Sequence, residues 1–383
     1  MPSSKSTKTL PEPLSTLVNA PPRPAATPCR VRRVIVITPM MGGADGISEM
    51  TRQWVRVLES RVGRDLGALD VWSLDDDTRP ASTAAATGFH TARGGRMRFA
   101  SLAMRDGIAA AADTLVVVMH LHLLPVALPL VWRGAKLLPI LMGIEAWAPL
   151  RPLERVALER AWKVTAISAH TVARFRAANP SLATLPITVC RPGTPSMTYP
   201  APERFDGPYA LIVGRMHSRE RYKGHDLLIE VWPLVRSAVP DARLIIAGDG
   251  DDAPRLRAKA GEGIDFVGRV DEARLAALYR DATLFVMPST DEGFGLVYLE
   301  AMRASTPCIA ARGAAEEIIT DGRDGVIIDA GDRDALVAAL VQLFADPHAR
   351  ARMAVAALQR VTGEFGATAL DTRVRGVLEL GED

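Results

Sequence analysis

Two glutamates stand eight residues apart in the segment PSTDEGFGLVYLEAM, which begins at Pro288. Glu292 lies beside Gly293 and Gly295, and Glu300 follows within a stretch whose pattern predicts a helix. Glycines at the start of a helix let backbone N–H groups approach a ligand, and the helix N-terminus favours anionic groups. Two carboxylates at this separation can accept hydrogen bonds from hydroxyls at opposite ends of a long polyol. The segment predicts a binding site, and a capping acid with a solvated surface glutamate is the alternative.

Two cations form a second candidate site. Arg215 follows Gly214 at the end of an apolar run, and Lys223 precedes Gly224 after the polar loop MHSRERY. Arginine donates through a planar fork and lysine acts as a point charge, so two cations at the end of a strand suit a diphosphate. An ordinary basic loop is the alternative.

Short β-branched runs alternate with amphipathic stretches along the chain, which is typical of parallel sheets built from βαβ units. Strands are expected in the front half at 34–38, 69–73, 115–119, 136–141, 164–167 and 187–190, and in the back half at 209–213, 243–247, 265–267, 284–287, 308–310 and 326–328. Helices are expected at 48–59, 97–112, 153–162, 169–177, 225–238, 272–279, 295–303 and 335–344.

These elements predict an α/β protein with two Rossmann-like, doubly wound domains that face a central cleft. Ligands of such sheets bind beyond the carboxyl ends of the strands, so the cleft is the expected site. Residues 191–207 hold four prolines without periodicity and indicate a linker. The expected units are a disordered tail over 1–33, domains over 34–190 and 208–360, and a C-terminal helix over 361–383 that packs back on the first domain.

Composition excludes several classes of protein. The chain has 383 residues, 48% of them hydrophobic, which suffices for two cores. A balance of 46 basic and 44 acidic residues, with 5% aromatics, gives no support for a nucleic-acid partner. Three distant cysteines form neither a disulfide framework nor a metal-ligand pattern, so a cytoplasmic location is expected.

No membrane-spanning or secretory segment is expected. Residues 1–30 lack the apolar core of a signal peptide. The most apolar window, 115–132, is interrupted by prolines and histidines and favours a buried strand followed by a helix. The front half is nevertheless basic: residues 34–190 carry 17 basic and 13 acidic side chains. Its stretch 97–112 mixes arginines with apolar residues and predicts either contact with an anionic membrane surface or an ordinary solvated helix.

Five features, in order, resemble the retaining nucleotide-sugar glycosyltransferases of family 4, which have the GT-B architecture. They are the loop Met41-Gly42-Gly43, Gly214-Arg215 with Lys223-Gly224, Ala247-Gly248-Asp249-Gly250, Gly268-Arg269-Val270, and the spacing of Glu292 and Glu300. The likeness covers residues 34–360 and is most specific over 209–330.

The resemblance implies roles for the charged residues. Arg215 and Lys223 look like the pair that holds the donor's diphosphate and stabilises charge on the departing nucleotide. Glu292 resembles the glutamate that faces the transferred sugar, and Glu300 resembles the one that binds the ribose hydroxyls. Arg215, Lys223 and Glu292 are therefore the expected catalytic residues, with no metal and no cofactor.

Neighbouring residues complete the donor site that the resemblance implies. Gly43 of the front domain would close against the phosphates, and the backbone at Arg269 and Val270 would border the nucleobase. The remaining donor-binding segment, which lies near sugar and phosphate, is Gly293, Phe294, Gly295 and Leu296. Family members retain the anomeric configuration, which implies a front-face substitution in which the leaving phosphate helps to deprotonate the acceptor.

The front half departs from the family pattern at one position. Many members carry a histidine just before a Gly-Ile-Glu-x-Trp stretch, whereas Met142 stands there in this chain. His120 and His122, at the end of the preceding strand, and Glu145, within the stretch, are the acceptor-side candidates. Structural histidines are the alternative for the first two.

The predicted function is hexosyl transfer from a UDP- or GDP-sugar to a glycan hydroxyl. The expected acceptor is a lipid-linked oligosaccharide of bacterial polysaccharide biosynthesis, and the expected location is cytoplasmic or peripheral at the inner face of the membrane. A sugar-nucleotide epimerase and a non-catalytic sugar-nucleotide binding protein are the alternatives. The loop at 39–46 is not G-x-G-x-x-G, so a dinucleotide-dependent oxidoreductase is disfavoured.

Overall fold

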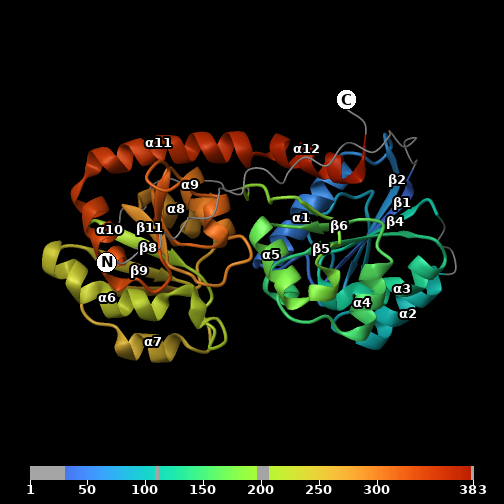
Figure 1. The fold of residues 1–383 in the computed structure, drawn as a ribbon, viewed down its shortest axis with the longest axis horizontal. Helices are drawn as coiled ribbons and strands as arrows, with labels where there is room; N and C mark the ends of the chain where they lie inside the picture. The colour runs from blue at the N-terminus through green and yellow to red at the C-terminus, as the bar shows by residue number, and fades with distance from the viewer. Residues whose placement is uncertain (1–30, 108–111, 196–206, 381–383) are drawn as a thin grey trace, which may run out of the picture.

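The structure is a computed structural model that describes residues 31–107, 112–195 and 207–380. It has two α/β lobes, each built on a parallel sheet flanked by helices (Figure 1). The predicted fold class of two Rossmann-like domains is confirmed. Most of the predicted tail and linker lies outside the described residues.

Seven strands form the N-terminal sheet in the order β3-β2-β1-β4-β5-β6-β7, and all neighbours pair in parallel. All five residues of β4 are buried, because a parallel sheet covered by helices buries both faces. The strands are β1 Val31–Thr38, β2 Leu66–Ser73, β3 Gly88–Thr91, β4 Thr114–Val118, β5 Lys136–Leu141, β6 Val164–Ala166 and β7 Ile187–Val189.

Helices connect these strands. Asp45 caps the first one by accepting hydrogen bonds from the N–H groups of Ile47 and Ser48, which satisfies two donors that the helix leaves open. The helices are α1 Gly46–Glu59, α2 Arg96–Gly107, α3 Leu124–Trp132, α4 Pro152–Glu159 and α5 Ala169–Ala178, with 3-10 turns η2 Leu121–Leu123, η3 Ile144–Ala146 and η4 Pro180–Leu182.

Six parallel strands form the C-terminal sheet in the order β10-β9-β8-β11-β12-β13. They are β8 Tyr209–Val213, β9 Arg243–Ala247, β10 Ile264–Gly268, β11 Leu284–Met287, β12 Cys308–Ala311 and β13 Gly325–Ile328. The connections hold α6 His225–Ala238, α7 Ala253–Lys259, α8 Glu272–Asp281, α9 Leu296–Arg303 and α10 Arg333–Ala345, with 3-10 turns η5 Arg221–Lys223 and η6 Ala314–Glu317.

The strand order places one switch point in each sheet. In the N-terminal sheet the chain turns to opposite sides after β1 and after β4, and in the C-terminal sheet after β8 and after β11. Loops that leave the carboxyl ends of such neighbouring strands diverge and leave a crevice, where ligands of these folds bind. Most candidate residues of the sequence lie in these four loops and in the loops after β5 and β10, and Leu296 and Glu300 lie in α9.

Two C-terminal helices join the lobes. The first, α11 Pro347–Glu364, runs along the C-terminal lobe and contacts α9 and α10, and the second, α12 Ala367–Leu378, contacts α1 (Figure 1). Lys163 Nζ donates to the carbonyl of Val377 (2.8 Å), and Arg61 pairs with Asp371 (3.4 Å). The expected C-terminal helix corresponds to α12, which contacts the first lobe; it begins at Ala367 rather than at 361, because the chain breaks at Phe365, and residues 381–383 lie outside the described residues.

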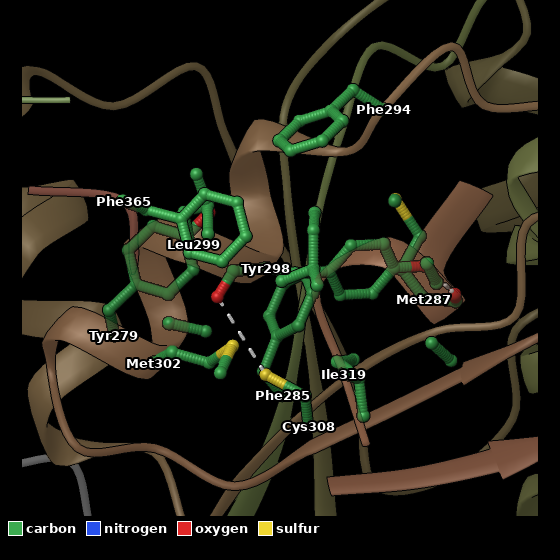
Figure 2. Close-up of a cluster of buried hydrophobic side chains, with 14 of the residues drawn as sticks. Tyr279, Phe285, Met287, Phe294, Tyr298, Leu299, Met302, Cys308, Ile319 and Phe365 are labelled. Carbon is green, nitrogen blue, oxygen red and sulfur yellow. Dashed lines mark hydrogen bonds between the residues drawn. The ribbon is translucent and has the colours of Figure 1, made fainter. Parts of the chain in front are cut away.

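A buried aromatic cluster lies at this break. Phe365 is fully buried, and its ring centroid lies 6.0 Å from that of Phe294, which precedes α9. Figure 2 shows Phe365 among side chains from α8, β11 and α9. The cluster consists of Tyr279, Phe285, Met287, Phe294, Tyr298, Leu299, Met302, Cys308, Ile319 and Phe365. The loop that carries Glu292 is thereby anchored to the connection between the lobes.

The boundaries differ from the prediction in places. Strand β1 begins at Val31, inside the segment that was expected to be a tail, because Val31 pairs with Leu66 of β2. Strand β3 was not predicted; all four of its residues are only partly buried, so it lacks an apolar run. The window 115–132 forms a strand and a following helix as expected, and no helix of the described residues is long and apolar enough to cross a membrane.

Candidate active site

Three charged side chains meet where β8 ends. Arg215 Nη2 donates to Glu220 Oε1 (2.7 Å), and Lys223 Nζ lies 3.5 Å from Glu220 Oε2. Lys223 Nζ also lies 3.9 Å from Glu292 Oε1, in the loop after β11. The structure thus brings together the two predicted cations and the first predicted glutamate. It adds Glu220, whose place in the cluster depends on the fold of the loop.

Glu292 is largely buried, with 19% of its side chain exposed. Burial raises the pKa of its carboxyl group, and the neighbouring Lys223 ammonium partly opposes that rise. The hydroxyl of Ser289 donates to Glu292 Oε1 (3.3 Å). The carboxylate is therefore held within reach of a cation but keeps capacity to accept hydrogen bonds from a ligand.

The N-terminus of α9 presents unused donors. Among the described residues, no acceptor is found for the backbone N–H groups of Phe294, Gly295 and Leu296. Gly295 has φ +98°, and a Cβ there would lie 2.5 Å from the ring of Tyr298, so glycine is required at this turn. Successive N–H groups at a helix N-terminus form a site for an anion.

Glu300 lies one helix turn deeper in the same element. The hydroxyl of Tyr279 donates to its Oε2 (2.7 Å), and burial raises the pKa of Glu300 to about 7. Glu49 of α1 and Glu272 of α8 also raise this pKa through their negative charge. The second predicted glutamate therefore lies within electrostatic range of α1 in the other lobe.

The loop after β1 is held in a compact turn. Asp76 accepts hydrogen bonds from the N–H groups of Met41 (2.7 Å) and Gly42 (2.9 Å). Arg52 Nη1 donates to the carbonyl of Gly43 (2.7 Å). A Cβ at Gly46 would lie 3.9 Å from Leu296, so this loop approaches the start of α9. Gly43 lies in this loop, three residues before Gly46.

Arg269 and Val270 lie apart from the charged cluster. They follow β10 at the edge of the C-terminal sheet, where the N–H of Gly248 donates to the carbonyl of Gly268 (2.8 Å). Arg269 is exposed, and β9 lies between its strand, β10, and β8, which leads to Arg215.

The acceptor-side candidates form their own group after β4 and β5. His122 Nδ1 lies 2.8 Å from Glu154 Oε1 of α4, and the His120 and His122 rings are 4.9 Å apart. Burial lowers the pKa of His120 to about 4, so this imidazole is neutral at pH 7. Glu145 Oε1 accepts the N–H of Met142 (2.6 Å), and burial raises the pKa of Glu145.

The sequence analysis missed four polar residues that contact the candidate residues, because these contacts depend on how loops and distant segments fold together. Within residues 31–107, 112–195 and 207–380, no group of three or more His, Cys, Asp and Glu is arranged to hold a metal ion. The missed residues are Glu154, Ser168, Glu220 and Tyr279.

The structure has two Rossmann-like lobes that face each other, with candidate residues at the carboxyl ends of both sheets. This arrangement is the GT-B architecture, which is known from glycosyltransferases. Residues 207–346 match the family model described as "Glycosyl transferases group 1". The match spans the C-terminal lobe from β8 to the end of α10.

Curated relatives match part of the chain. It is 34% identical over 243 residues to a GDP-mannose-dependent alpha-(1-6)-phosphatidylinositol monomannoside mannosyltransferase of Mycolicibacterium smegmatis, over 56% of this chain and 62% of that protein. It is 38% identical to a phosphatidyl-myo-inositol mannosyltransferase of Mycobacterium leprae, over 40% of this chain and 42% of that protein. The chain thus spans less than two thirds of the length of these relatives.

Solved structures share the whole fold. Sucrose-phosphate synthase from Thermosynechococcus elongatus superposes with a TM-score of 0.74 at 20% identity, covering 91% of this chain and 98% of that one. Anabaena HepE in complex with UDP and glucose gives a TM-score of 0.72 at 19% identity, covering 91% and 99%. At these identities the likeness establishes the architecture alone.

Proposed function

We propose that this protein is a retaining glycosyltransferase of family 4 that moves a hexosyl unit from a nucleotide diphosphate sugar to a hydroxyl of a lipid-linked glycan. The proposal is carried by one observation: Lys223 Nζ lies 3.9 Å from Glu292 Oε1. This pair places a cation and a carboxylate side by side next to the unused N–H groups that begin α9.

The cations bind the diphosphate in this proposal. Arg215 and Lys223 approach the donor's phosphates from the loop after β8, and the N–H groups at α9 approach from the loop after β11. Negative charge grows on the diphosphate as the glycosidic bond breaks, and preorganised cations and dipoles stabilise it there. These groups supply the charge stabilisation without a metal ion, so we expect activity to survive chelators.

The two glutamates contact the rest of the donor. Glu292 accepts hydrogen bonds from hydroxyls of the transferred sugar, and Glu300 accepts them from the ribose. The backbone at Arg269 and Val270 borders the nucleobase, and Gly43 closes over the phosphates from the other lobe. The acceptor hydroxyl attacks on the face that the diphosphate leaves, and a phosphate oxygen takes its proton.

GDP-mannose is the first donor to test. The relative from Mycolicibacterium smegmatis is described as GDP-mannose-dependent, and it shares 34% identity over a match that includes more than half of this chain. UDP-glucose is the comparison donor, because the architecture also occurs in a protein solved with UDP and glucose. The relatives' names describe lipid acceptors, which supports a lipid-linked acceptor here.

A surface on α2 suits a membrane-bound acceptor. Met97 and Met104 are 83% and 63% exposed and stand seven residues apart, on one face of the helix. Arg98 and Arg105, also exposed, lie beside them with the same spacing. Exposed apolar side chains flanked by arginines suit an anionic lipid surface, so we place the protein in the cytoplasm and peripherally at the inner face of the membrane.

Transfer of radiolabelled sugar tests the proposal. The purified protein is incubated with GDP-mannose or UDP-glucose and a membrane lipid extract as acceptor, and labelled glycolipid is measured. Lys223→Ala and Glu292→Ala are each expected to lower the rate by about 10²-fold or more, because each removes a charge at the reacting centre. Lys259→Ala, which removes an exposed lysine on α7, is the matched control.

Assays with and without the acceptor distinguish a glycosyltransferase from the two alternative functions. An epimerase turns over the donor without an acceptor, and a non-catalytic binding protein binds the donor without turnover. Transfer that persists at the normal rate in a Lys223→Ala/Glu292→Ala double variant would overturn the assignment of the site.

A further inference from the structure

Two hydroxyls of the N-terminal lobe contact one carbonyl in the loop after β11, which carries Glu292. Ser168 Oγ lies 2.7 Å from the carbonyl oxygen of Gly293, and Thr171 Oγ1 lies 3.3 Å from the same oxygen. Both side chains are fully buried at the start of α5. Gly293 directly follows Glu292, so these hydroxyls hold the loop of the proposed catalytic carboxylate from the opposite lobe.

The Gly293 carbonyl accepts a hydrogen bond from at least one of the two hydroxyls, whichever way the protons of Ser168 and Thr171 are arranged. Ser168 Oγ accepts the N–H of Thr171 and donates either to Gly293 or to Thr171 Oγ1 (2.8 Å). When Ser168 donates to Thr171, the hydroxyl of Thr171 donates to Gly293. The contact is therefore a hydrogen bond across the lobes rather than packing alone.

A fixed carbonyl also fixes an N–H group. The Gly293 carbonyl and the Phe294 N–H belong to one planar trans peptide, in which they point in opposite directions. The Phe294 N–H is among the groups for which no acceptor is found in the described residues. A hydrogen bond to the carbonyl also polarises the peptide and makes its N–H a stronger donor.

We infer that Ser168 and Thr171 are positioning residues that aim the Phe294 N–H at the donor, so that the donor site is complete only when the lobes are in contact. The inference rests on the proposed function, because it requires a donor at the start of α9. Neither residue touches the donor; both act through the peptide between Gly293 and Phe294.

The backbones of Gly143 and Gly293 also lie too close together at this contact between the lobes to admit a side chain. A Cβ at Gly143, in the loop after β5, would lie 2.9 Å from the Cα of Gly293. Arg174, also on α5, pairs with Asp291 (3.1 Å) and lies over the ring of Trp147 (4.3 Å). Arg174 crosses the same interface without contacting Gly293, so it offers a matched control.

Steady-state kinetics of Ser168→Ala/Thr171→Val test the inference. The double variant removes both hydroxyls, and we expect kcat to fall about 10- to 100-fold through misplacement of the N–H. Arg174→Gln removes an ion pair of the same interface, and we expect it to keep kcat within about twofold. Affinity for the nucleoside diphosphate, measured by calorimetry, should weaken in the double variant but not in Arg174→Gln.

A pair of variants at Ser168 covers the case in which the double variant does not fold. Ser168→Ala removes the nearer hydroxyl and leaves only Thr171 Oγ1, at 3.3 Å, to reach the carbonyl of Gly293, whereas Ser168→Thr keeps a hydroxyl. We expect Ser168→Thr to hold kcat near the wild-type value and Ser168→Ala to lower it several-fold. Equal kcat in both variants, or equal loss in Arg174→Gln and the double variant, would overturn the inference.

Lys223→Ala in the same calorimetric assay separates the two proposals. Unchanged nucleotide affinity in Lys223→Ala contradicts the proposed function itself. Loss of affinity in Lys223→Ala together with wild-type kcat and affinity in the Ser168→Ala/Thr171→Val variant overturns only the role of the hydroxyls.

Discussion

The hydroxyl of Tyr279 donates a hydrogen bond to Glu300 Oε2 over 2.7 Å and joins α8 to α9. The bond stabilises the ionised carboxylate, but burial outweighs it and raises the pKa of Glu300 from 4.5 to about 7. The glutamate proposed to bind the ribose is therefore partly protonated at neutral pH.

Donor binding is expected to depend on pH through Glu300. A carboxylate accepts hydrogen bonds from both ribose hydroxyls, so affinity for a nucleotide sugar should rise as the pH increases from about 6 to about 8 and Glu300 loses its proton. Glu300→Gln should bind more weakly at pH 8 and show a flatter dependence. Calorimetry with the intact nucleotide sugar measures this, and an equal slope in both proteins would contradict the prediction.

The same group links stability to pH in the opposite sense. A raised pKa means that the folded protein holds the proton more tightly than the unfolded chain, so the contribution to stability is present below pH 4.5 and is lost as the pH rises to about 7. Glu300→Gln should therefore gain on the order of 1–3 kcal/mol relative to wild type at pH 8 and little at pH 5. Denaturant unfolding at the two pH values checks the sign.

Glu220 is expected to act as a substitute anion in the absence of donor. Its carboxylate lies 2.7 Å from Arg215 and 3.5 Å from Lys223, and the donor's diphosphate must compete with it for both cations. Glu220→Gln should raise affinity for inorganic pyrophosphate and for the nucleoside diphosphate by about 3- to 10-fold. Glu262→Gln, at an exposed carboxylate paired with Arg236, is the control. Weaker binding in Glu220→Gln would mean that Glu220 positions the cations instead.

The acceptor is expected to meet His122. Nδ1 of His122 faces Glu154 Oε1 (2.8 Å), which leaves Nε2 on a side chain that is 44% exposed. His122→Ala and Glu154→Gln should each raise the KM for the acceptor about 5- to 10-fold and leave the KM for the donor unchanged. His348→Ala, on the surface of α11, controls for the loss of an imidazole. A change confined to the KM for the donor would mean that His122 contacts the donor and not the acceptor.

Membrane binding is expected to depend on α2. Met97→Asp/Met104→Asp should abolish sedimentation with vesicles that contain anionic phosphatidylglycerol at low salt, because it replaces the apolar contact with negative charge. Val355→Asp, at an exposed apolar residue of α11, should sediment like wild type. Wild-type protein that remains in the supernatant would contradict the membrane surface on α2.

Phe365 is expected to be a major contributor to stability. Its ring is fully buried and packs near Phe294, and truncation to alanine should cost about 3–5 kcal/mol of unfolding free energy. Leu358→Ala, at a residue 40% exposed on α11, should cost far less. Denaturant melts compare the two, and equal losses would show that the aromatic cluster does not anchor α11.

The alternation of strand and helix was readable from the sequence because it depends on local patterns. Buried β-branched runs predicted β4, β8 and β9 closely, and glycines with polar loops marked the carboxyl ends of strands, where ligands of such folds bind. Spacing alone also singled out Arg215, Lys223, Glu292 and Glu300. These features rest on residues that are neighbours in the chain, so their physics is local.

Tertiary structure alone decided which groups contact the candidate residues and the segments that carry them. Ser168 reaches the carbonyl of Gly293 across 125 residues of sequence, and Phe365 packs on Phe294 although the two are distant in sequence. Glu220 is close to Arg215 in sequence, yet only the path of the loop turns it onto both cations. Pairings of this kind follow from how two sheets and their helices pack, because buried polar groups take the partners that packing leaves within reach. The sequence therefore determined the motifs of the candidate site, and the packing of two lobes determined how they are held.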